Sequence, residues 1–528
     1  MAVVVIGSGP AGAAAAMALC DAGLQVTVLD AGDTVEAGRM DLFDALARSE
    51  PEHWPPRLAL QARDAFPADI KHVPLKPAFG SLFPYVLNDP DLSITCEGCD
   101  ALSSLAYGGL SNAWGASILP FRQPDMANWP ISLSQLAPHY EAVQRFVPVA
   151  AERDELGETI PLYTDQPHTL RRSQQAEKLL GHLRQHAPAL KGAGFTFGAS
   201  RLAVEASPAA SHHCRHCGMC LYGCPYGSIY NSAHTFNELR RAGRIDYRGG
   251  IYVDRLTEVG SSVRVDFHTR GRTRANGQLT AARVLVACGA ISSTRLMLAS
   301  MKYTKRVHRM HDSQYFVIPM VTRHAAPVSV ATQGNTLAQV FLELEGQRIS
   351  KHAVHLQIYG YNDIMLSALA KRLPLSSATL ERALRPALGR LVVIQGFMHS
   401  TDSPALKITY DSDRVTVTSE DETVGATHVK RLVRRLAAYC GSLGMAPIPI
   451  PGIVHVGRPG KSNHLGGSLP MRRNPGELET DVLGRVNGWQ RVHIVDASIF
   501  PSVPATTITL SVMANSHRVA TAVAHTER

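Results

Sequence analysis

The chain has 528 residues, of which 45% are hydrophobic and 18% charged, and its formal net charge is +9. This composition excludes a disordered chain, a collagen-like fibre and a small scaffold held by disulfides. We find no apolar run of about 18 residues that could span a membrane, and no signal peptide at the start of the sequence. The modest basic excess lacks the aromatic-interleaved stripe expected of a nucleic-acid-binding protein.

A dinucleotide-binding motif stands at the start of the chain. The apolar run 2–6 leads into a G-x-G-x-x-G turn, an Ala-rich stretch that favours helix, and a second apolar run ending at Asp30. Gly7 permits the tight turn, Gly9 lets the backbone approach a pyrophosphate, and Gly12 lets the helix pack closely on the strand. The helix N-terminus can bind the phosphates and Asp30 a ribose hydroxyl. A purely structural glycine turn, the alternative, leaves Asp30 unexplained.

Two later segments indicate further parts of the same site. A strand-like run at 284–287 leads into a turn at Gly289, and another at 492–495 ends at Asp496 and Ala497. A carboxylate at the end of a buried strand needs a polar partner. In a flavin site, Asp496 can bind the ribityl chain.

The motifs together resemble the glucose-methanol-choline (GMC) family of FAD oxidoreductases. They are the first glycine turn, 108–115, 129–140, 288–290, the H-L-G-G-S segment 464–468, and 495–498 followed by Pro501. The resemblance implies an α/β fold, with a Rossmann-type FAD-binding domain and an inserted α+β substrate domain built on an antiparallel sheet. It also implies FAD contacts by Gly109, Ser111, Asn112, Ala113 and Val253, although Val253 also reads as an ordinary strand valine.

The same resemblance predicts the domain organisation. We expect the FAD-binding domain over residues 1–309, with a Cys-rich segment at about 205–232, the substrate domain over 310–450, and a return to the FAD-binding domain over 451–528. Within 310–450, strand-like runs occur at 339–344, 354–359 and 405–410, and helical stretches at about 363–390 and 427–443.

The resemblance also assigns the catalytic residues. Alcohol oxidation needs hydride transfer and removal of the hydroxyl proton, and histidine suits the second task near neutral pH. His464 takes the family's catalytic-base position, with a structural histidine as the alternative. The family's second His or Asn falls on Thr507, which can position a substrate but cannot act as a base near pH 7. Its alternative role is a helix N-cap.

Two further positions bear on the cofactor and the substrate. Some sugar-oxidising relatives carry at the Ala113 position a histidine bonded covalently to FAD. Alanine cannot form that bond, so we expect non-covalent FAD. His355 and His399 are polar candidates for the substrate pocket, with core or surface histidines as the alternative.

Four of the nine cysteines form a C-x₂-C-x₂-C-x₃-C-P run, the spacing of bacterial ferredoxins. The thiolates of Cys214, Cys217, Cys220 and Cys224 could hold an iron–sulfur cluster, 4Fe-4S or, with one thiol spare, 3Fe-4S. A four-thiolate zinc site and a cofactor-free loop are the alternatives. The run also resembles the cluster segment of bacterial FAD glucose dehydrogenases of this family.

A second pair, Cys96 and Cys99, could add a ligand to the cluster, form a redox disulfide or only make a turn. An odd number of cysteines argues against a secreted disulfide framework. Cluster assembly indicates folding in the cytoplasm, with export beside a partner subunit left open.

The sequence therefore predicts an FAD-dependent dehydrogenase that oxidises an alcohol, preferably a sugar or glycoside hydroxyl. Electrons would pass through the cluster to a quinone, a cytochrome or a partner subunit. One alternative is an oxidase that uses O₂ and has only a structural Cys loop. The other is a flavin and iron–sulfur subunit that carries electrons without oxidising an alcohol. A sterol or lipid alcohol also remains open as substrate.

Overall fold

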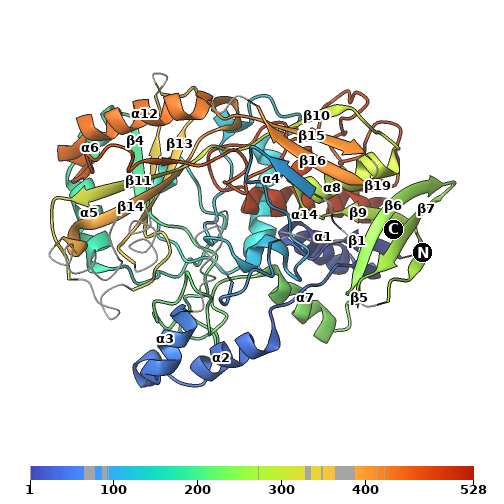
Figure 1. The fold of residues 1–528 in the computed structure, drawn as a ribbon, viewed down its shortest axis with the longest axis horizontal. Helices are drawn as coiled ribbons and strands as arrows, with labels where there is room; N and C mark the ends of the chain where they lie inside the picture. The colour runs from blue at the N-terminus through green and yellow to red at the C-terminus, as the bar shows by residue number, and fades with distance from the viewer. Residues whose placement is uncertain are drawn as a thin grey trace.

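A computed structural model describes residues 2–64, 78–85, 92, 94–271, 273–327, 334–346, 349–362, 387–411, 413–420 and 423–527. Its first lobe, on the right of Figure 1, is built on a parallel sheet of five strands in the order β19-β9-β1-β2-β5. Both faces of its central strands are buried, which explains their continuous apolar runs. The strands are β1 (Val3–Ile6), β2 (Val26–Leu29), β5 (Ile245–Arg248), β9 (Arg283–Val286) and β19 (Val492–Ile494).

Helices cover this sheet. The Ala-rich α1 (Pro10–Asp21) has a side surface small enough to lie close to α14 (Thr509–Glu527), which in turn contacts α4 (Leu133–Gln144). Two more helices belong to the same lobe, α7 (Ser232–Arg241) and α8 (Ala290–Ser300). Helices α2 (Ala37–Ala47) and α3 (Pro56–Asp64) lie at the lower edge of Figure 1.

Two smaller sheets complete the first lobe. One is an antiparallel meander of β6 (Ile251–Val259), β7 (Ser262–Thr269) and β8 (Asn276–Ala281). The other has the order β10-β15-β16-β3, with β10 (Val307–Met310), β15 (Leu406–Asp411), β16 (Arg414–Ser419) and β3 (Ile94–Glu97). Leu406 and Ile408 of β15 belong to the same hydrophobic core as the parallel sheet.

The second lobe, on the left of Figure 1, is a seven-stranded antiparallel sheet with the order β17-β11-β14-β13-β12-β4, and with β18 paired to β11. One face packs against α5 (Gln174–Gln185), α6 (Ala187–Gly192), α12 (Thr423–Ala438) and α13 (Cys440–Leu443). The strands are β4 (Phe195–Ala199), β11 (Tyr315–Thr322), β12 (Val340–Leu344), β13 (Val354–Tyr359), β14 (Leu391–Phe397), β17 (Met445–Pro447) and β18 (His455–Val456).

The predicted fold class is confirmed: a Rossmann-like α/β lobe is joined to a lobe built on an antiparallel sheet. The strand expected at 405–410 forms as β15, but it pairs within the first lobe, whereas β4 joins the second. The helix expected at about 363–390 falls at 363–386 outside the described residues. The domain boundaries at 309 and 450 stay a prediction.

Candidate active site

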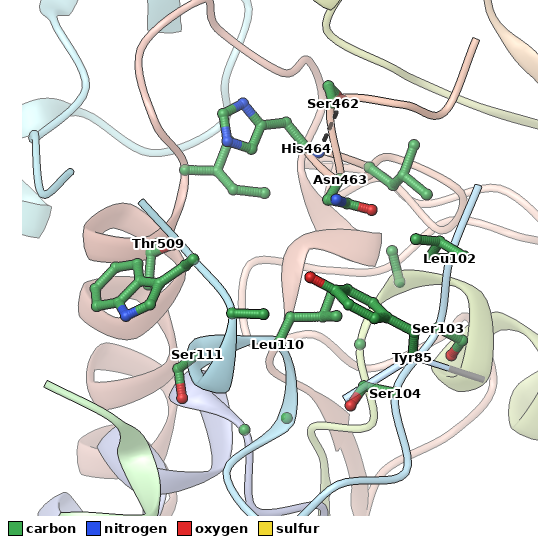
Figure 2. Close-up of a pocket in the computed structure, with 18 of the residues that line it drawn as sticks. Tyr85, Leu102, Ser103, Ser104, Leu110, Ser111, Ser462, Asn463, His464 and Thr509 are labelled. Carbon is green, nitrogen blue, oxygen red and sulfur yellow. Dashed lines mark hydrogen bonds between the residues drawn. The ribbon is translucent and has the colours of Figure 1, made fainter. Parts of the chain in front are cut away.

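A cavity of about 790 Å³ lies between the two lobes. The β1–α1 turn, the β9–α8 turn and the loop 102–115 line one side of it, and strands β11, β13 and β14 line the other. The predicted flavin-site residues line this cavity except Gly12 and Asn112, which lie behind its wall. Figure 2 shows His464, Asn463 and Tyr85 projecting toward the same space.

The first glycine turn is shaped by three different constraints. Gly7 has a φ of +104°, and a Cβ there would lie 2.6 Å from the Ala287 carbonyl oxygen. A Cβ on Gly12 would lie 2.0 Å from the Gly7 carbonyl oxygen, so a side chain would force the helix off the strand. A Cβ on Gly9 would meet nothing within 4 Å, and Gly9 lines the cavity. The backbone at Gly9 is therefore open to a ligand, as a pyrophosphate requires.

Asp30 is buried at the end of β2 and reaches back to the glycine turn. Its carboxylate accepts hydrogen bonds from the Ser8 backbone N–H (3.1 Å), the Ser8 hydroxyl (2.7 Å) and the Tyr247 hydroxyl (2.9 Å). Burial raises the pKa of Asp30 to about 6, although these hydrogen bonds act in the opposite direction. Asp30 thus orders the turn while it also lines the cavity.

The turn that begins at Gly109 lies directly against the first glycine turn. Gly109 has a φ of +58°, and a Cβ there would come within 3.1 Å of the Gly9 Cα atom. The Ser111 hydroxyl donates to the Gly108 carbonyl oxygen (2.5 Å). The Asn112 amide donates to the Tyr107 and Gly109 carbonyl oxygens, so this side chain holds the turn from behind.

Asp496 holds a third turn at the cavity. It is buried and accepts hydrogen bonds from the Gly289 backbone N–H (2.9 Å), the Ser293 hydroxyl, and both the backbone N–H and the hydroxyl of Ser498. Burial raises the pKa of Asp496, and these hydrogen bonds oppose the rise. The residues Gly289, Asp496 and Ala497 line the cavity, as does Val253.

His464 stands on the loop between β18 and β19. Its imidazole ring stacks on Phe397 with the centroids 4.6 Å apart and an interplanar angle of 29°. The Nδ1 atom is buried and has no hydrogen-bond partner, and Figure 2 shows the ring projecting toward the cavity. Burial is the main cause that lowers the pKa of His464 to about 3. The ring is therefore neutral at pH 7.

A buried carboxylate fixes the loop that carries His464. The His464 backbone N–H donates to the Ser462 hydroxyl (2.8 Å), and that hydroxyl donates to Asp312 (2.5 Å). Asp312 also accepts from the Gly460 backbone N–H (2.7 Å). Burial raises the pKa of Asp312 to about 7, against these hydrogen bonds. Neighbouring Asn463, with a φ of +58° and a buried, unpartnered Oδ1, also lines the cavity.

Thr507 also lines the cavity. Its hydroxyl is buried and donates to the Ser117 carbonyl oxygen (3.1 Å). It lies two residues before α14 begins at Thr509, so it is not the residue that caps this helix. Because the hydroxyl proton is donated to Ser117, only the hydroxyl oxygen is left to form a hydrogen bond with a ligand, as an acceptor.

A polar row crosses the sheet face that lines the cavity, and the sequence analysis missed it. Strand pairing aligns Gln357 of β13 with Gln395 of β14, Gln395 with Val317 of β11, and Val317 with His455 of β18. All of these residues line the cavity, together with the aromatic side chains of Trp114, Tyr315, Tyr359 and Phe397. Period-two alternation in each strand was the only signal for this face.

The two histidines considered for the substrate pocket lie behind its wall. His355 is fully buried and contacts Glu343 of β12. His399 stacks on His352 with the ring centroids 3.7 Å apart, and burial lowers its pKa to about 3. Neither side chain lines the cavity.

The four cysteines of the C-x₂-C-x₂-C-x₃-C run face one small apolar cavity of their own. Cys214, Cys217, Cys220 and Cys224 line it together with apolar residues such as Leu170. Burial and the neighbouring thiolates raise the pKa of Cys214 to about 12. Within the described part of the chain, no group of three or more His, Cys, Asp or Glu residues is arranged to hold a single metal ion.

The second cysteine pair makes a turn beside the loop that carries His464. Cys96 is exposed and donates to the Ala101 carbonyl oxygen (3.3 Å), and Cys99 is buried and donates to that of Val417 (3.4 Å). Neither lines the cavity of the four-cysteine run. Among the described helices, none is long and apolar enough to cross a membrane.

Comparisons with known proteins agree with this geometry. Two family models described as GMC oxidoreductase match residues 164–307 and 399–516, and one described as an NAD(P)-binding Rossmann-like domain matches 5–42. The chain is similar to a 2-methyl-1,2-propanediol dehydrogenase of Mycolicibacterium austroafricanum, with 26% identity over 312 residues, which are 56% of this chain. The match spans 50% of that relative's length.

Among solved structures, the crystal structure of pyridoxine 4-oxidase from Mesorbium loti has a TM-score of 0.62 and covers 99% of both chains. The two sequences are only 14% identical, so this likeness shows the fold alone.

Proposed function

This chain belongs to the GMC oxidoreductase family, and from that premise we propose that it is an FAD-dependent dehydrogenase that oxidises an alcohol to a carbonyl. One observation carries the proposal. A histidine that is neutral at pH 7 projects into a large cavity, whose opposite wall is formed by the glycine turns of a dinucleotide site. That arrangement brings a proton acceptor and a hydride acceptor to one substrate.

The residues of the cavity fit FAD. Gly9 and Gly109 leave room for a backbone approach, α1 presents its N-terminus to the same space, and buried Asp30 and Asp496 stabilise the surrounding turns. FAD bound there would accept a hydride from the substrate carbon. Ala113 lines the cavity and offers no nucleophile, so we propose that FAD is bound non-covalently and is released by acid denaturation.

His464 would take the proton of the substrate hydroxyl at Nε2. Its low pKa keeps the lone pair available at neutral pH. The stacking on Phe397 and the hydrogen bond to Ser462 fix the ring and the backbone, so little reorganisation is needed when the substrate binds. The acceptor oxygens of Thr507 and Asn463 would help to orient the substrate.

The wall of the substrate sheet favours a polyhydroxylated substrate. Gln357, Gln395 and His455 offer several donors and acceptors in one row, and Tyr359 and Trp114 offer aromatic faces beside them. A pocket lined by several directed polar groups fits a ligand with matching hydroxyls better than it fits a sterol. We therefore keep a sugar or glycoside as the proposed substrate.

The four cysteines are proposed to hold an iron–sulfur cluster, 4Fe-4S or 3Fe-4S. The support is their ferredoxin-like spacing and their position around one apolar cavity. Such a cluster would supply a one-electron acceptor beside the flavin domain. The zinc alternative has no support beyond the cysteines themselves, since within the described residues no group of three or more His, Cys, Asp or Glu is arranged to hold a single metal ion.

Anaerobic titration of the purified flavoprotein tests the function. We expect at least one of D-glucose, methyl glucoside, glycerol and 2-methyl-1,2-propanediol to bleach the oxidised flavin. His464→Ala should slow this reduction by at least about 100-fold without lowering FAD content, and His525→Ala, at the far end of α14, should not. If His464→Ala reduced its flavin as fast as wild type, His464 would not be the catalytic base.

Two rival functions have distinct outcomes. An oxidase would release stoichiometric peroxide under air in step with substrate use, whereas the proposed dehydrogenase would reduce an added quinone or cytochrome faster than O₂. A subunit that only carries electrons would show no bleaching with any alcohol while still accepting electrons from a chemical reductant. Cytoplasmic residence and a partner subunit as electron acceptor remain predictions of the sequence.

A further inference from the structure

A buried histidine–carboxylate pair lies behind the substrate wall without touching the cavity. His355 Nδ1 is 2.5 Å from Glu343 Oε1, on the paired strands β13 and β12. The two residues are 0% and 1% exposed. Replacing such a pair by apolar residues is often neutral or stabilising, so stability alone does not account for it.

The contact between His355 and Glu343 continues as a chain of hydrogen bonds along one face of β13. Gln357 Nε2 lies 3.1 Å from His355 Nε2, and the Tyr359 hydroxyl lies 3.1 Å from Gln357 Oε1. The residues His355, Gln357 and Tyr359 are two positions apart, as one face of a strand requires. Gln357 and Tyr359 are 3% exposed and line the cavity.

The hydrogen bonds of this chain can all run in one direction. A carboxylate oxygen of Glu343 accepts from His355 Nδ1, and the Gln357 amide group then donates to His355 Nε2. Gln357 then turns its oxygen to Tyr359. The Tyr359 hydroxyl donates to that oxygen, and only its lone pair remains for a ligand. Aligned chains of this kind strengthen each member.

Two buried guanidinium groups interact electrostatically with Glu343. Burial opposes the charge of Arg122, but the hydrogen bonds and charge of Asp125 and the charge of Glu343 together raise its pKa. Burial lowers the pKa of Arg201 to about 10, and the charges of Asp154 and Glu343 act in the opposite direction. Glu343, the acceptor at the end of the chain, therefore lies in the field of two positive charges.

Tyr359 is placed to meet a substrate. It lines the cavity, and a Cβ on Gly115 would lie 3.3 Å from its hydroxyl oxygen, so the hydroxyl faces the loop that runs from the flavin side. We propose that Tyr359 determines substrate specificity by accepting a hydrogen bond from a substrate hydroxyl, and that Glu343, His355 and Gln357 are positioning residues that fix Tyr359 as an acceptor. This inference rests on the proposed function and names one recognition contact of that site.

Stopped-flow flavin reduction tests the contact, using whichever of the four titration compounds reduces the flavin fastest. Tyr359→Phe should raise the Kd for that compound about 5- to 20-fold and leave the limiting rate within twofold, because one ground-state hydrogen bond is lost. Tyr439→Phe, whose ring packs on the apolar core of the same lobe and does not line the cavity, is the control and should leave the Kd within twofold. An unchanged Kd in Tyr359→Phe would overturn the proposal.

A double-mutant cycle tests the positioning. Glu343→Gln should raise the Kd about 3- to 10-fold beside native Tyr359 and have no further effect beside Tyr359→Phe. If Glu343→Gln had the same effect beside native Tyr359 and beside Tyr359→Phe, Glu343 would have only a structural role. If Glu343→Gln does not fold, Gln357→Met breaks the same chain one residue from Tyr359 and should show the same non-additivity.

A readout without substrate separates this proposal from the proposed function. With 3-fluorotyrosine at position 359, Glu343→Gln or Gln357→Met should shift the fluorine NMR resonance, and the same label at position 439 should not respond. If no alcohol reduces the flavin but the 359 resonance shifts, the dehydrogenase assignment fails while the chain of hydrogen bonds stands. A 359 resonance that does not respond overturns the positioning role whatever the substrate.

Discussion

The imidazole of His464 stacks on the ring of Phe397, with the centroids 4.6 Å apart. This contact joins the loop between β18 and β19 to the last residue of β14, so each lobe contributes to the position of the proposed base. The catalytic geometry therefore depends on how the antiparallel sheet is set against the flavin lobe.

Replacing Phe397 should impair catalysis more than stability. Phe397→Leu keeps an apolar side chain but loses the flat face under the imidazole, and a displacement of about 1 Å can cost about 100-fold in rate. We expect the limiting rate of flavin reduction to fall about 10- to 100-fold. Phe341→Leu, whose ring lies against His355 and not against the base, is the control.

Thermal unfolding decides whether the two phenylalanine variants are comparable. Each should lose a similar free energy of unfolding, on the order of 1–3 kcal/mol, since both changes remove the same carbons from a buried site. A Phe397→Leu enzyme that turns over like wild type would show that the stacking does not position His464.

Two glycines of the first turn should respond differently to alanine. A Cβ on Gly12 would collide with the Gly7 carbonyl oxygen at 2.0 Å, whereas one on Gly9 meets no protein atom within 4 Å. Gly12→Ala should therefore lower the melting temperature of the apoprotein. Gly9→Ala should leave the apoprotein as stable as wild type and weaken FAD binding at least about 10-fold, measured by flavin fluorescence. Equal FAD affinity in Gly9→Ala would contradict the placement of the pyrophosphate.

These two glycines also illustrate what the sequence could predict. The turn, its helix and the acid at Asp30 are neighbours in the chain, and their spacing alone encodes the geometry. The row formed by Gln357, Gln395 and His455 has no such local signal, because it depends on the register of four strands that are far apart in sequence. The pairing of β15 within the flavin lobe was missed for the same reason.

The Cys-rich segment and Asn112 show a second limit. Spacing identified four cysteines that face one cavity, but it could not predict whether their sulfurs close around a ligand. Asn112 was predicted to contact FAD, yet its amide holds the 109–112 turn from behind. Motifs of this kind locate a loop, whereas the direction of each side chain follows from neighbours such as Tyr107.

Asp312 should make stability depend on pH. Burial raises the pKa of this carboxyl to about 7, against about 3.9 in an unfolded chain. The folded protein then binds the proton more tightly, so this contribution to stability is complete below about pH 3.9 and is lost as pH rises to about 7. The melting temperature of wild type minus that of Asp312→Asn should therefore fall between pH 5 and pH 7.5.

Activity should have the opposite dependence on the same group. The ionised carboxylate accepts the Ser462 hydroxyl that in turn holds the His464 backbone. Flavin reduction should slow as pH falls below about 7, although His464, with a pKa of about 3, does not titrate there. Asp312→Asn should flatten this acidic limb. An acidic limb that persists unchanged in Asp312→Asn would assign it to another group.

Iron analysis decides the role of the Cys-rich segment. Protein purified without oxygen should contain four acid-labile sulfides for each FAD. It should contain four iron atoms for each FAD if the cluster is 4Fe-4S and three if it is 3Fe-4S. Cys217→Ser should abolish most of this iron, because Cys217 is buried at the shared cavity, whereas exposed Cys440→Ser should retain it. Electron transfer to a one-electron acceptor should fall with the iron, while anaerobic reduction of the flavin by substrate should continue, since His464 lines a different cavity. Wild-type protein with intact flavin, reduced thiols and no iron would make the segment a structural loop and favour the oxidase.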